Sequence, residues 1–219
     1  MYRITHSLLS AWDYATGDRA GDDSLAEFVK TLKREPKQRT QSMQAGIDFE
    51  DEVTFYAANG YLKYDDAPKM QVVTAMGDTI IQDVHTYSDA ERKAIIRFGE
   101  KVRWAAPQVR AEKEMKINGI DFLLVGVADY LKAGIIYDTK RIGMYEYGRY
   151  VSNTQHPMYF ELFPEAVRFD YLIFDGYQTH VETFRRTDCE PIQNHISRFV
   201  RDLRDVGLLE TYKEYWEEK

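Results

Sequence analysis

The segment from Gly126 to Ile142 constrains the fold most strongly, because it places charged residues inside otherwise apolar runs. It reads GVADYLKAGIIYDTKRI, and two apolar stretches around a short turn predict a β-hairpin. Side chains alternate along a strand, so Asp138 and Lys140 would share one face, with Thr139 on the other. The turn would bring Asp129 back beside Asp138, which predicts a cluster of charge at one end of a small sheet.

This cluster has a chemical consequence. A buried carboxylate is costly to desolvate unless it is paired or bound to a cation. Carboxylate oxygens such as those of Asp129 and Asp138 favour magnesium or manganese, and a lysine beside them suits a water that attacks a phosphate. The alternative is an ion pair on a solvated hairpin. The string D-x8-D-x-K is compatible with both a metal site and a solvated ion pair. Other parts of the sequence are needed to choose between them.

Length and composition limit the class of protein. A chain of 219 residues can fill one hydrophobic core, and its 44% hydrophobic and 30% charged content is typical of a soluble globular protein. No apolar run approaches the roughly 20 residues that span a bilayer. The first residues lack the apolar region and cleavage site of a secretory signal. We therefore expect a cytoplasmic protein that does not associate with membranes.

Cysteine and histidine content limits the cofactors. The one cysteine, Cys189, excludes a disulfide framework and a four-cysteine cluster within a single chain. The five histidines form no H-x-x-x-H pair, which argues against a zinc helix. We therefore expect no iron–sulfur cluster.

The charge is unevenly distributed. A net charge of −7 argues mildly against nonspecific coating of nucleic acid, but not against a nuclease, whose metal ligands are themselves acids. The segment Lys30–Arg39 is locally basic, and its Lys33, Arg34 and Lys37 are candidate contacts to DNA phosphates. The alternative is that this predicted helix only presents a solvated basic face.

Hydrophobic periodicity and turn signals predict an α/β chain. The expected helices are 6–15, 24–34, 42–59, 88–104, 155–163, 191–206 and 209–218. The expected strands are 72–75, 79–82, 109–117, 120–131, 135–142, 167–175 and 179–186. No repeat or linker divides the chain, so we expect a single α/β domain over residues 1–219 with extra helices at both ends.

The third predicted helix carries a carboxylate on its apolar side. Glu50 lies beside Phe49 and Val53, whereas Glu52 is expected to point away from this face. Gly46, one turn earlier, would allow a close approach to the helix. A carboxylate directed at the core needs a partner. The alternative is that Glu50 lies at the margin of the apolar stripe and its carboxylate extends into water.

A glutamine opens the helix that follows the hairpin. Gln155 begins QHPMY, in which Pro157 suits the first turn and Tyr159 lies one turn further along. A glutamine at a helix N-terminus beside a metal site could position a phosphate or the attacking water. The alternative is a simple helix cap.

Four short motifs together resemble a known family. GIDFE (Gly46–Glu50), GVAD (Gly126–Asp129), DTK (Asp138–Lys140) and QHPMY (Gln155–Tyr159) follow the order and spacing of the PD-(D/E)XK nuclease superfamily. They are most similar to its RecB-like or phage-type exonuclease branch. The opening ITHSLLSAWDYA also resembles the helix with which many members begin. The resemblance implies a restriction-endonuclease-like core at about 42–190, a mixed central β-sheet flanked by helices.

The resemblance also implies roles for individual residues. The magnesium or manganese ligands would be three carboxylates and one backbone carbonyl, those of Glu50, Asp129, Asp138 and Thr139. Lys140 would position or deprotonate the attacking water and stabilise the charge that develops on phosphorus. Gln155 and Tyr159 would hold the DNA backbone or organise the site.

The function implied by the resemblance is a magnesium-dependent DNA exonuclease of phage or mobile-element recombination or repair. No nucleotide-binding motif G-x-x-x-x-G-K-[ST] occurs, so a recombinase, single-strand annealing protein or helicase partner would be a separate chain. Two alternatives stay open: a catalytically silent nuclease-fold module for DNA binding or assembly, and a structure-selective endonuclease.

Overall fold

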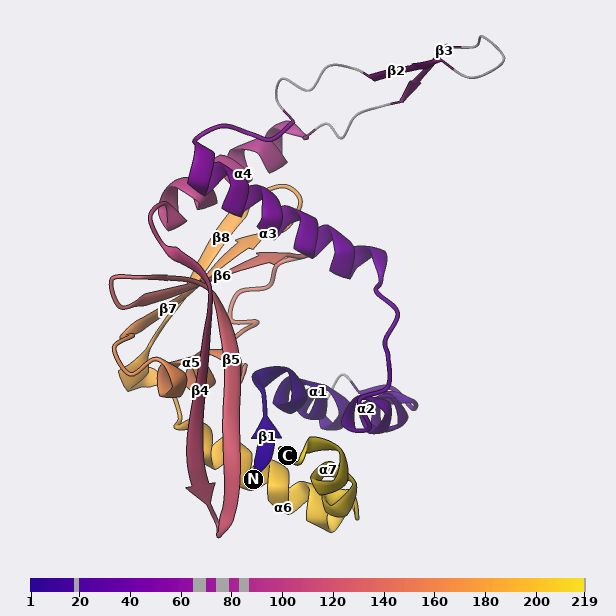
Figure 1. Cartoon of the computed structure of the whole chain (residues 1–219), viewed down its shortest axis with the longest axis vertical. Coiled ribbons are helices and arrows are strands. Elements are labelled where there is room, and N and C mark those ends of the chain that lie inside the picture. Colours follow the sequence, from indigo (N-terminus) through magenta and orange to yellow (C-terminus); the bar gives the residue numbers. More distant parts are fainter. Residues whose placement is uncertain (18–19, 65–69, 74–78, 83–86, 219) are drawn as a thin grey trace.

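The computed structural model describes residues 1–17, 20–64, 70–73, 79–82 and 87–218 (Figure 1). The helices are α1 (His6–Thr16), α2 (Ser24–Leu32), α3 (Gln41–Asn59), α4 (Asp89–Val102), α5 (Gln155–Leu162), α6 (Ile192–Asp205) and α7 (Leu209–Trp216). The strands are β1 (Tyr2–Ile4), β2 (Met70–Val73), β3 (Thr79–Gln82), β4 (Ala106–Ile117), β5 (Ile120–Lys132), β6 (Ile135–Arg141), β7 (Arg168–Phe174) and β8 (Thr179–Arg185).

The main sheet is mixed. In the part of the chain that the structure describes it has six strands, in the order β1-β5-β6-β7-β8, with β4 also paired to β5. The pairs β1–β5 and β6–β7 are parallel, and the others are antiparallel. The strands β2 and β3 form a separate antiparallel pair. The α/β fold predicted from the sequence, a mixed sheet flanked by helices, is confirmed.

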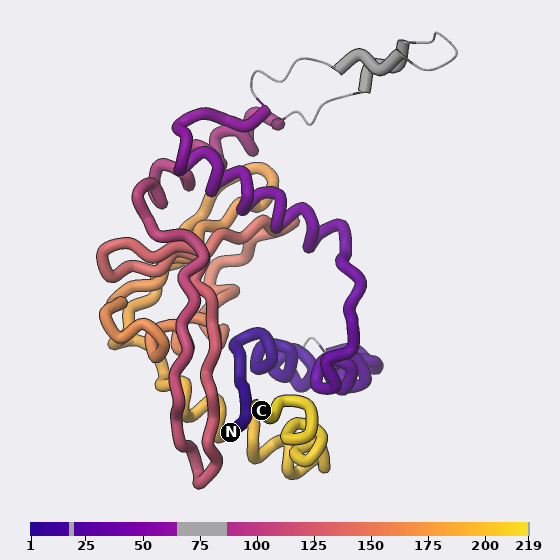
Figure 2. Tube along the Cα trace, in the orientation of Figure 1, coloured from indigo at the N-terminus to yellow at the C-terminus, as the bar shows by residue number. Residues whose placement is uncertain are grey.

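Helices cover both faces of this sheet. The larger, aromatic-rich core lies between the sheet and α1, α2, α5, α6 and α7, and the smaller core lies under α3 and α4. Figure 2 shows α3 and α4 at the top of the view and α1, α2, α6 and α7 at the bottom. The strand β7 is central and buried on both sides: Phe169 and Tyr171 pack into the larger core, and Leu172 and Phe174 into the smaller one.

Local signals in the sequence set some of the helix boundaries. The side chain of Thr5 accepts a hydrogen bond from the Leu8 N–H at the start of α1, and Ser88 does the same for the Glu91 N–H at the start of α4. Helix α3 ends at Gly60, whose φ of 79° is the left-handed conformation that glycine adopts most easily. No helix of the described residues is long and apolar enough to cross a membrane.

The strand β1 and the end of α2 differ from the predictions. The strand β1 has no counterpart among the predicted strands. The turn expected at residues 76–78 lies outside the described residues. The helix expected over 24–34 ends at Leu32, because Arg34 adopts a φ of 57° that an α-helix excludes. Lys37 therefore lies beyond the helix, and the basic segment Lys30–Arg39 is not one helical face.

The expected orientation of α3 is partly wrong. Phe49 and Val53 are buried as predicted, but Glu52, which was expected to point away from this face, is buried as well. Glu52 accepts a hydrogen bond from the Tyr87 hydroxyl, which provides the partner that a buried carboxylate needs. This partner lies in the segment before α4, so the burial of Glu52 depends on a tertiary contact that the sequence of α3 does not contain.

Candidate active site

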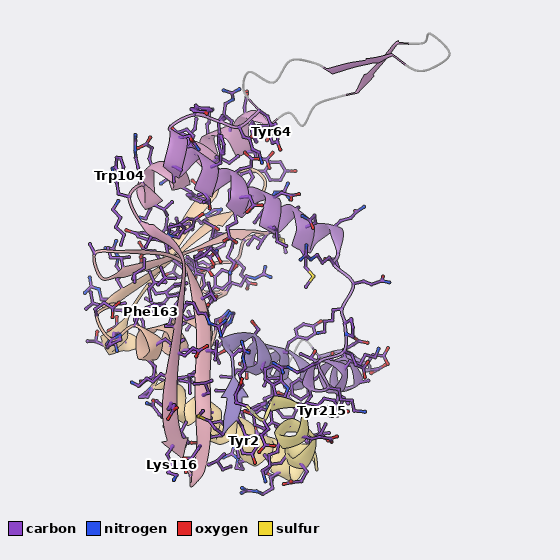
Figure 3. All side chains as sticks on the ribbon, in the orientation of Figure 1. Tyr2, Tyr64, Trp104, Lys116, Phe163 and Tyr215 are labelled. Carbon is purple, nitrogen blue, oxygen red and sulfur yellow. The ribbon has the colours of Figure 1, made fainter. Side chains whose placement is uncertain are left out.

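The strand β5 changes partners partway along its length. It pairs with β4 throughout, but on its other edge it pairs with β1 at Phe122–Leu124 and with β6 at Tyr130–Lys132. The stretch Val125–Asp129 lies between these two partners, where the sheet forks. Figure 3 shows Lys116 at the far end of the β4–β5 hairpin and therefore away from this fork.

A cleft of about 350 Å³ lies at the fork. It is lined by residues of β1, α1, α3, β4, β5, β6 and α5: Arg3, Thr5, His6, Ser7, Glu50, Arg110, Val125, Gly126, Val127, Asp129, Asp138, Thr139, Lys140, Gln155 and Tyr159. These include every residue that the family resemblance assigned to catalysis or metal binding. The four sequence motifs therefore meet in one cleft.

Asp138 is the most deeply buried of the cleft carboxylates, at 1% exposed. Its Oδ1 accepts a hydrogen bond of 2.5 Å from Gln155 Nε2, and its Oδ2 lies 2.6 Å from Lys140 Nζ. Asp138 and Lys140 thus share one face of β6, as the strand alternation predicted. The side chain of Gln155 is directed at Asp138 and does not cap its own helix.

The other two carboxylates have one hydrogen bond each from a different element. The Thr139 N–H donates to Asp129 Oδ2 at 3.1 Å, which brings Asp129 beside β6 as the predicted turn required. Gln108 Nε2 donates to Glu50 Oε1 at 2.6 Å. Glu50 also belongs to the cleft, so it is not simply a glutamate at the edge of the apolar stripe.

The charges of the cleft perturb one another. Burial, and then the charge of Asp138, raises the pKa of Asp129 well above its ordinary value, and the same two causes raise the pKa of Glu50. Burial alone would lower the pKa of Lys140, but Asp138 and Asp129 raise it above its ordinary value. Lys140 is therefore an ammonium ion at neutral pH, and the carboxylates still repel one another.

The donor chemistry fits magnesium. Glu50, Asp129 and Asp138 offer only oxygen ligands, which magnesium and manganese prefer, and their mutual repulsion is what a cation would relieve. In the arrangement described, no three His, Cys, Asp or Glu side chains within the described residues are grouped closely enough to hold a metal ion. Coordination would therefore require these side chains to converge further.

Tyr159 joins two of the motifs. Its hydroxyl donates to the Val127 carbonyl at 2.6 Å, and so satisfies a backbone acceptor on the forked edge of β5. Its ring packs on Gly126, where an added Cβ would lie 2.4 Å from Tyr159 Cε1 and 2.7 Å from Leu162 Cδ1. The glycine of GVAD is thus required by the tyrosine of QHPMY. In the structure Gln155 and Tyr159 organise the cleft walls.

No sequence motif pointed to the individual cleft residues of β1, β4 and the start of α1. Arg3 and His6 come from the opening segment, and Arg110 from β4, where it pairs with Glu112. Burial, and then the charge of Lys140, lowers the pKa of His6 to about 4, so its imidazole is neutral. The only signal for this wall was the resemblance of ITHSLLSAWDYA to the first helix of the family.

The predicted DNA contacts Lys33, Arg34 and Lys37 are not among the described residues that line the cleft. The Arg34 guanidinium lies 4.6 Å from the centre of the Trp216 ring, and its Nη1 lies 3.5 Å from the Tyr215 carbonyl. Lys33 and Lys37 are exposed. Arg34 thus has a packing role against α7, and a DNA contact by the other two remains a prediction.

Comparison with known proteins gives a fold-level likeness. No family model and no curated protein matches the chain. A solved structure that does match is the crystal structure of SSO0001, with 10% sequence identity and a TM-score of 0.50. The alignment covers 92% of this chain and 76% of that one. At this identity the likeness concerns the fold alone and agrees with the α/β architecture.

Proposed function

We propose that this protein is a magnesium-dependent DNA exonuclease of the PD-(D/E)XK superfamily, which hydrolyses phosphodiester bonds. One observation carries the proposal: Glu50, Asp129, Asp138, Lys140 and Gln155, from all four sequence motifs and from both helices and strands, line one cleft. A purely structural ion pair between Lys140 and Asp138 would not require two further carboxylates with raised pKa values beside it.

In the proposed reaction, Glu50, Asp129 and Asp138 would hold the metal, with the Thr139 carbonyl as a further ligand. Bound magnesium would polarise the scissile phosphate and supply an activated water. Gln155 fixes the orientation of Asp138 through its hydrogen bond, and the Thr139 N–H does the same for Asp129.

Lys140 acts as a positive charge in this mechanism. In the metal-free protein Asp138 and Asp129 raise the pKa of Lys140, so it retains its proton at neutral pH. It orients the water and stabilises the negative charge that develops on the phosphate oxygens.

A second candidate is a catalytically silent nuclease-fold module for DNA binding or assembly. One observation favours it: the carboxylates are not grouped as a metal site in the described residues. In either case DNA is the proposed ligand, and a recombinase, annealing protein or helicase would be a separate partner chain.

A cleavage assay on linear and on closed circular DNA separates the candidates. We expect magnesium to support degradation of linear DNA only, and calcium to support little cleavage because its looser coordination positions water poorly. Cleavage of closed circles would indicate an endonuclease, and DNA binding without cleavage the silent module. Asp138→Asn should abolish cleavage, while Asp170→Asn, a matched change at a buried aspartate outside the cleft, should not.

A further inference from the structure

Buried polar atoms without hydrogen bonds are concentrated at the cleft. In the part of the chain that the structure describes, the side-chain atoms with neither a hydrogen bond nor an ion-pair partner are Arg3 Nε, His6 Nδ1, Thr139 Oγ1 and Gln193 Oε1. The first three belong to residues that line the cleft. Such atoms are rare in folded proteins and call for a physical reason at each position. Their shared location indicates a polar ligand for this cleft.

These atoms belong to two chemically different walls. The wall from α3, β5 and β6 carries the carboxylates and Lys140, and accounts for a metal and a scissile phosphate. The other wall is the opening segment, from Arg3 in β1 to Ser7 in α1. Its unpartnered atoms, Arg3 Nε and His6 Nδ1, are nitrogens, and the Nε of an arginine is always a donor.

The start of α1 adds further donors to this wall. The first N–H groups of a helix have no intrahelical acceptor, and the Thr5 side chain satisfies only that of Leu8. His6 and Ser7, the first two residues of this 11-residue helix, line the cleft at the positive end of the helix. A helix N-terminus and a guanidinium together favour an anion.

Arg3 is also available to a ligand. Its ion pair, between Nη1 and Glu218 Oε1, has a length of 3.8 Å, and both side chains are partly exposed. Such a pair contributes little and can be exchanged for a better acceptor. Arg110, the other arginine of the cleft, is already held by Glu112 through two nitrogens.

We propose that the wall from Arg3 to Ser7 is a phosphate-binding subsite that holds one backbone phosphate of the DNA strand, adjacent to the phosphate that is cleaved. The inference rests on the proposed function and adds to it a second anchoring point for the substrate. Arg3 and the N–H groups of α1 donate to the non-bridging oxygens of this phosphate, and His6 Nδ1 contributes the remaining contact.

Neutralising single phosphates tests this subsite. DNA binding is measured by fluorescence anisotropy in calcium, with oligonucleotides that each carry one neutral methylphosphonate linkage. Wild-type protein should lose about tenfold in affinity at one linkage next to the cleavage position. Arg3→Ala should bind unmodified DNA about tenfold more weakly and be insensitive to that linkage, while Arg3→Lys restores part of both.

Two controls separate the subsite from general effects. Glu218→Gln removes the ion pair of Arg3 but keeps the arginine, and should retain the wild-type profile. Arg201→Ala removes an exposed positive charge that does not line the cleft, and should also retain it. Equal melting temperatures for Arg3→Ala and Glu218→Gln exclude a folding defect.

The outcomes distinguish this inference from the proposed function. If wild-type protein cleaves DNA but Arg3→Ala keeps the wild-type affinity and linkage profile, the subsite is wrong and the nuclease proposal stands. The subsite is also wrong, and the nuclease proposal also stands, if Arg3→Ala weakens DNA binding but still loses affinity at the neutral linkage that weakens the wild-type protein. If wild-type protein binds no DNA, the proposed function is wrong and the subsite with it.

Discussion

Two buried aspartates on neighbouring strands differ in how they are satisfied. Asp138 on β6 and Asp170 on β7 are each 1% exposed. Because Tyr137 pairs with Asp170, and Asp138 with Tyr171, the two carboxylates lie on opposite faces of the sheet. The two residues therefore share burial and strand environment but not partners.

Asp170 is fully compensated. Its Oδ1 accepts from the Thr183 hydroxyl at 2.9 Å and lies 3.2 Å from Arg168 Nε, and its Oδ2 lies 3.5 Å from Lys101 Nζ. Asp138 has one ammonium and one amide, and two further carboxylates share its cleft. The difference teaches that burial of a carboxylate alone does not mark a functional site. An excess of like charge with too few partners is the informative observation.

The largest expected effect is on the rate of DNA cleavage. It is tested by removing Lys140, which pairs with Asp138, and separately Lys101, which pairs with Asp170. Lys140→Ala should lower the rate of magnesium-dependent DNA cleavage on the order of 10²–10³-fold or more, about 3–4 kcal/mol of barrier, and leave the fold and metal binding largely intact. Lys101→Ala should leave the rate unchanged, because the carboxylate that Lys101 pairs with is the structural aspartate. A Lys140→Ala protein with a lowered melting temperature but the wild-type cleavage rate would contradict the proposed mechanism.

The packing of the cleft wall is tested at two glycines. Gly126→Ala should destabilise the protein by about 1–3 kcal/mol and displace Tyr159, because the new Cβ would overlap its ring. Gly46→Ala is the matched control: no described atom lies within 4 Å of its added Cβ, so a helix-interior alanine should stabilise by about 0.5–1 kcal/mol. Denaturant unfolding measures both, and equal stability changes would contradict the close contact at Gly126.

Replacing aspartate by asparagine should change the stability of the folded protein in opposite directions at Asp129, in the cleft, and at Asp170, outside it. The raised pKa of Asp129 means that the folded protein binds a proton more readily than the unfolded chain. Its ionisation therefore costs stability as the pH rises above about 4, the ordinary value for a carboxyl group.

Asp129→Asn should accordingly stabilise the metal-free protein at pH 7, by about 1–2 kcal/mol, and flatten the dependence of stability on pH. Asp170→Asn should destabilise it by a similar amount, because it weakens the interactions with Lys101 and Arg168. Thermal melting in EDTA between pH 4 and 8 measures both. Destabilisation by both variants would mean that the cleft carboxylates are structural as well.

The smallest expected effect concerns the basic segment outside the cleft. Changing Lys33 and Lys37 to glutamine should lower the salt dependence of DNA binding by about 0.7–0.9 units of slope for each phosphate that is no longer neutralised. Arg34→Ala needs separate treatment, because it also removes the packing of Arg34 on Trp216. An unchanged slope in the double lysine variant would mean that these residues form only a solvated surface.

Much of the architecture follows from local physics. Strand alternation assigned Asp138 and Lys140 to one face, and the turn at Ala133 and Gly134, both with positive φ, returns the chain so that Asp129 reaches β6. Caps at Thr5 and Gly60 act within one helical turn. Such features depend on hydrogen bonds and side chains a few residues apart, so a single sequence is sufficient to predict them.

Other features were decided only by the tertiary structure. The three-residue strand β1 has no periodicity of its own, and its parallel pairing with β5 depends on residues about half the chain away. That pairing creates the fork and adds Arg3 and His6 to the cleft. The burial of Glu52 and the packing of Arg34 on Trp216 likewise depend on distant partners. Local sequence cannot specify such contacts, because each is one of many weak pairings whose free energy is settled when the whole chain packs.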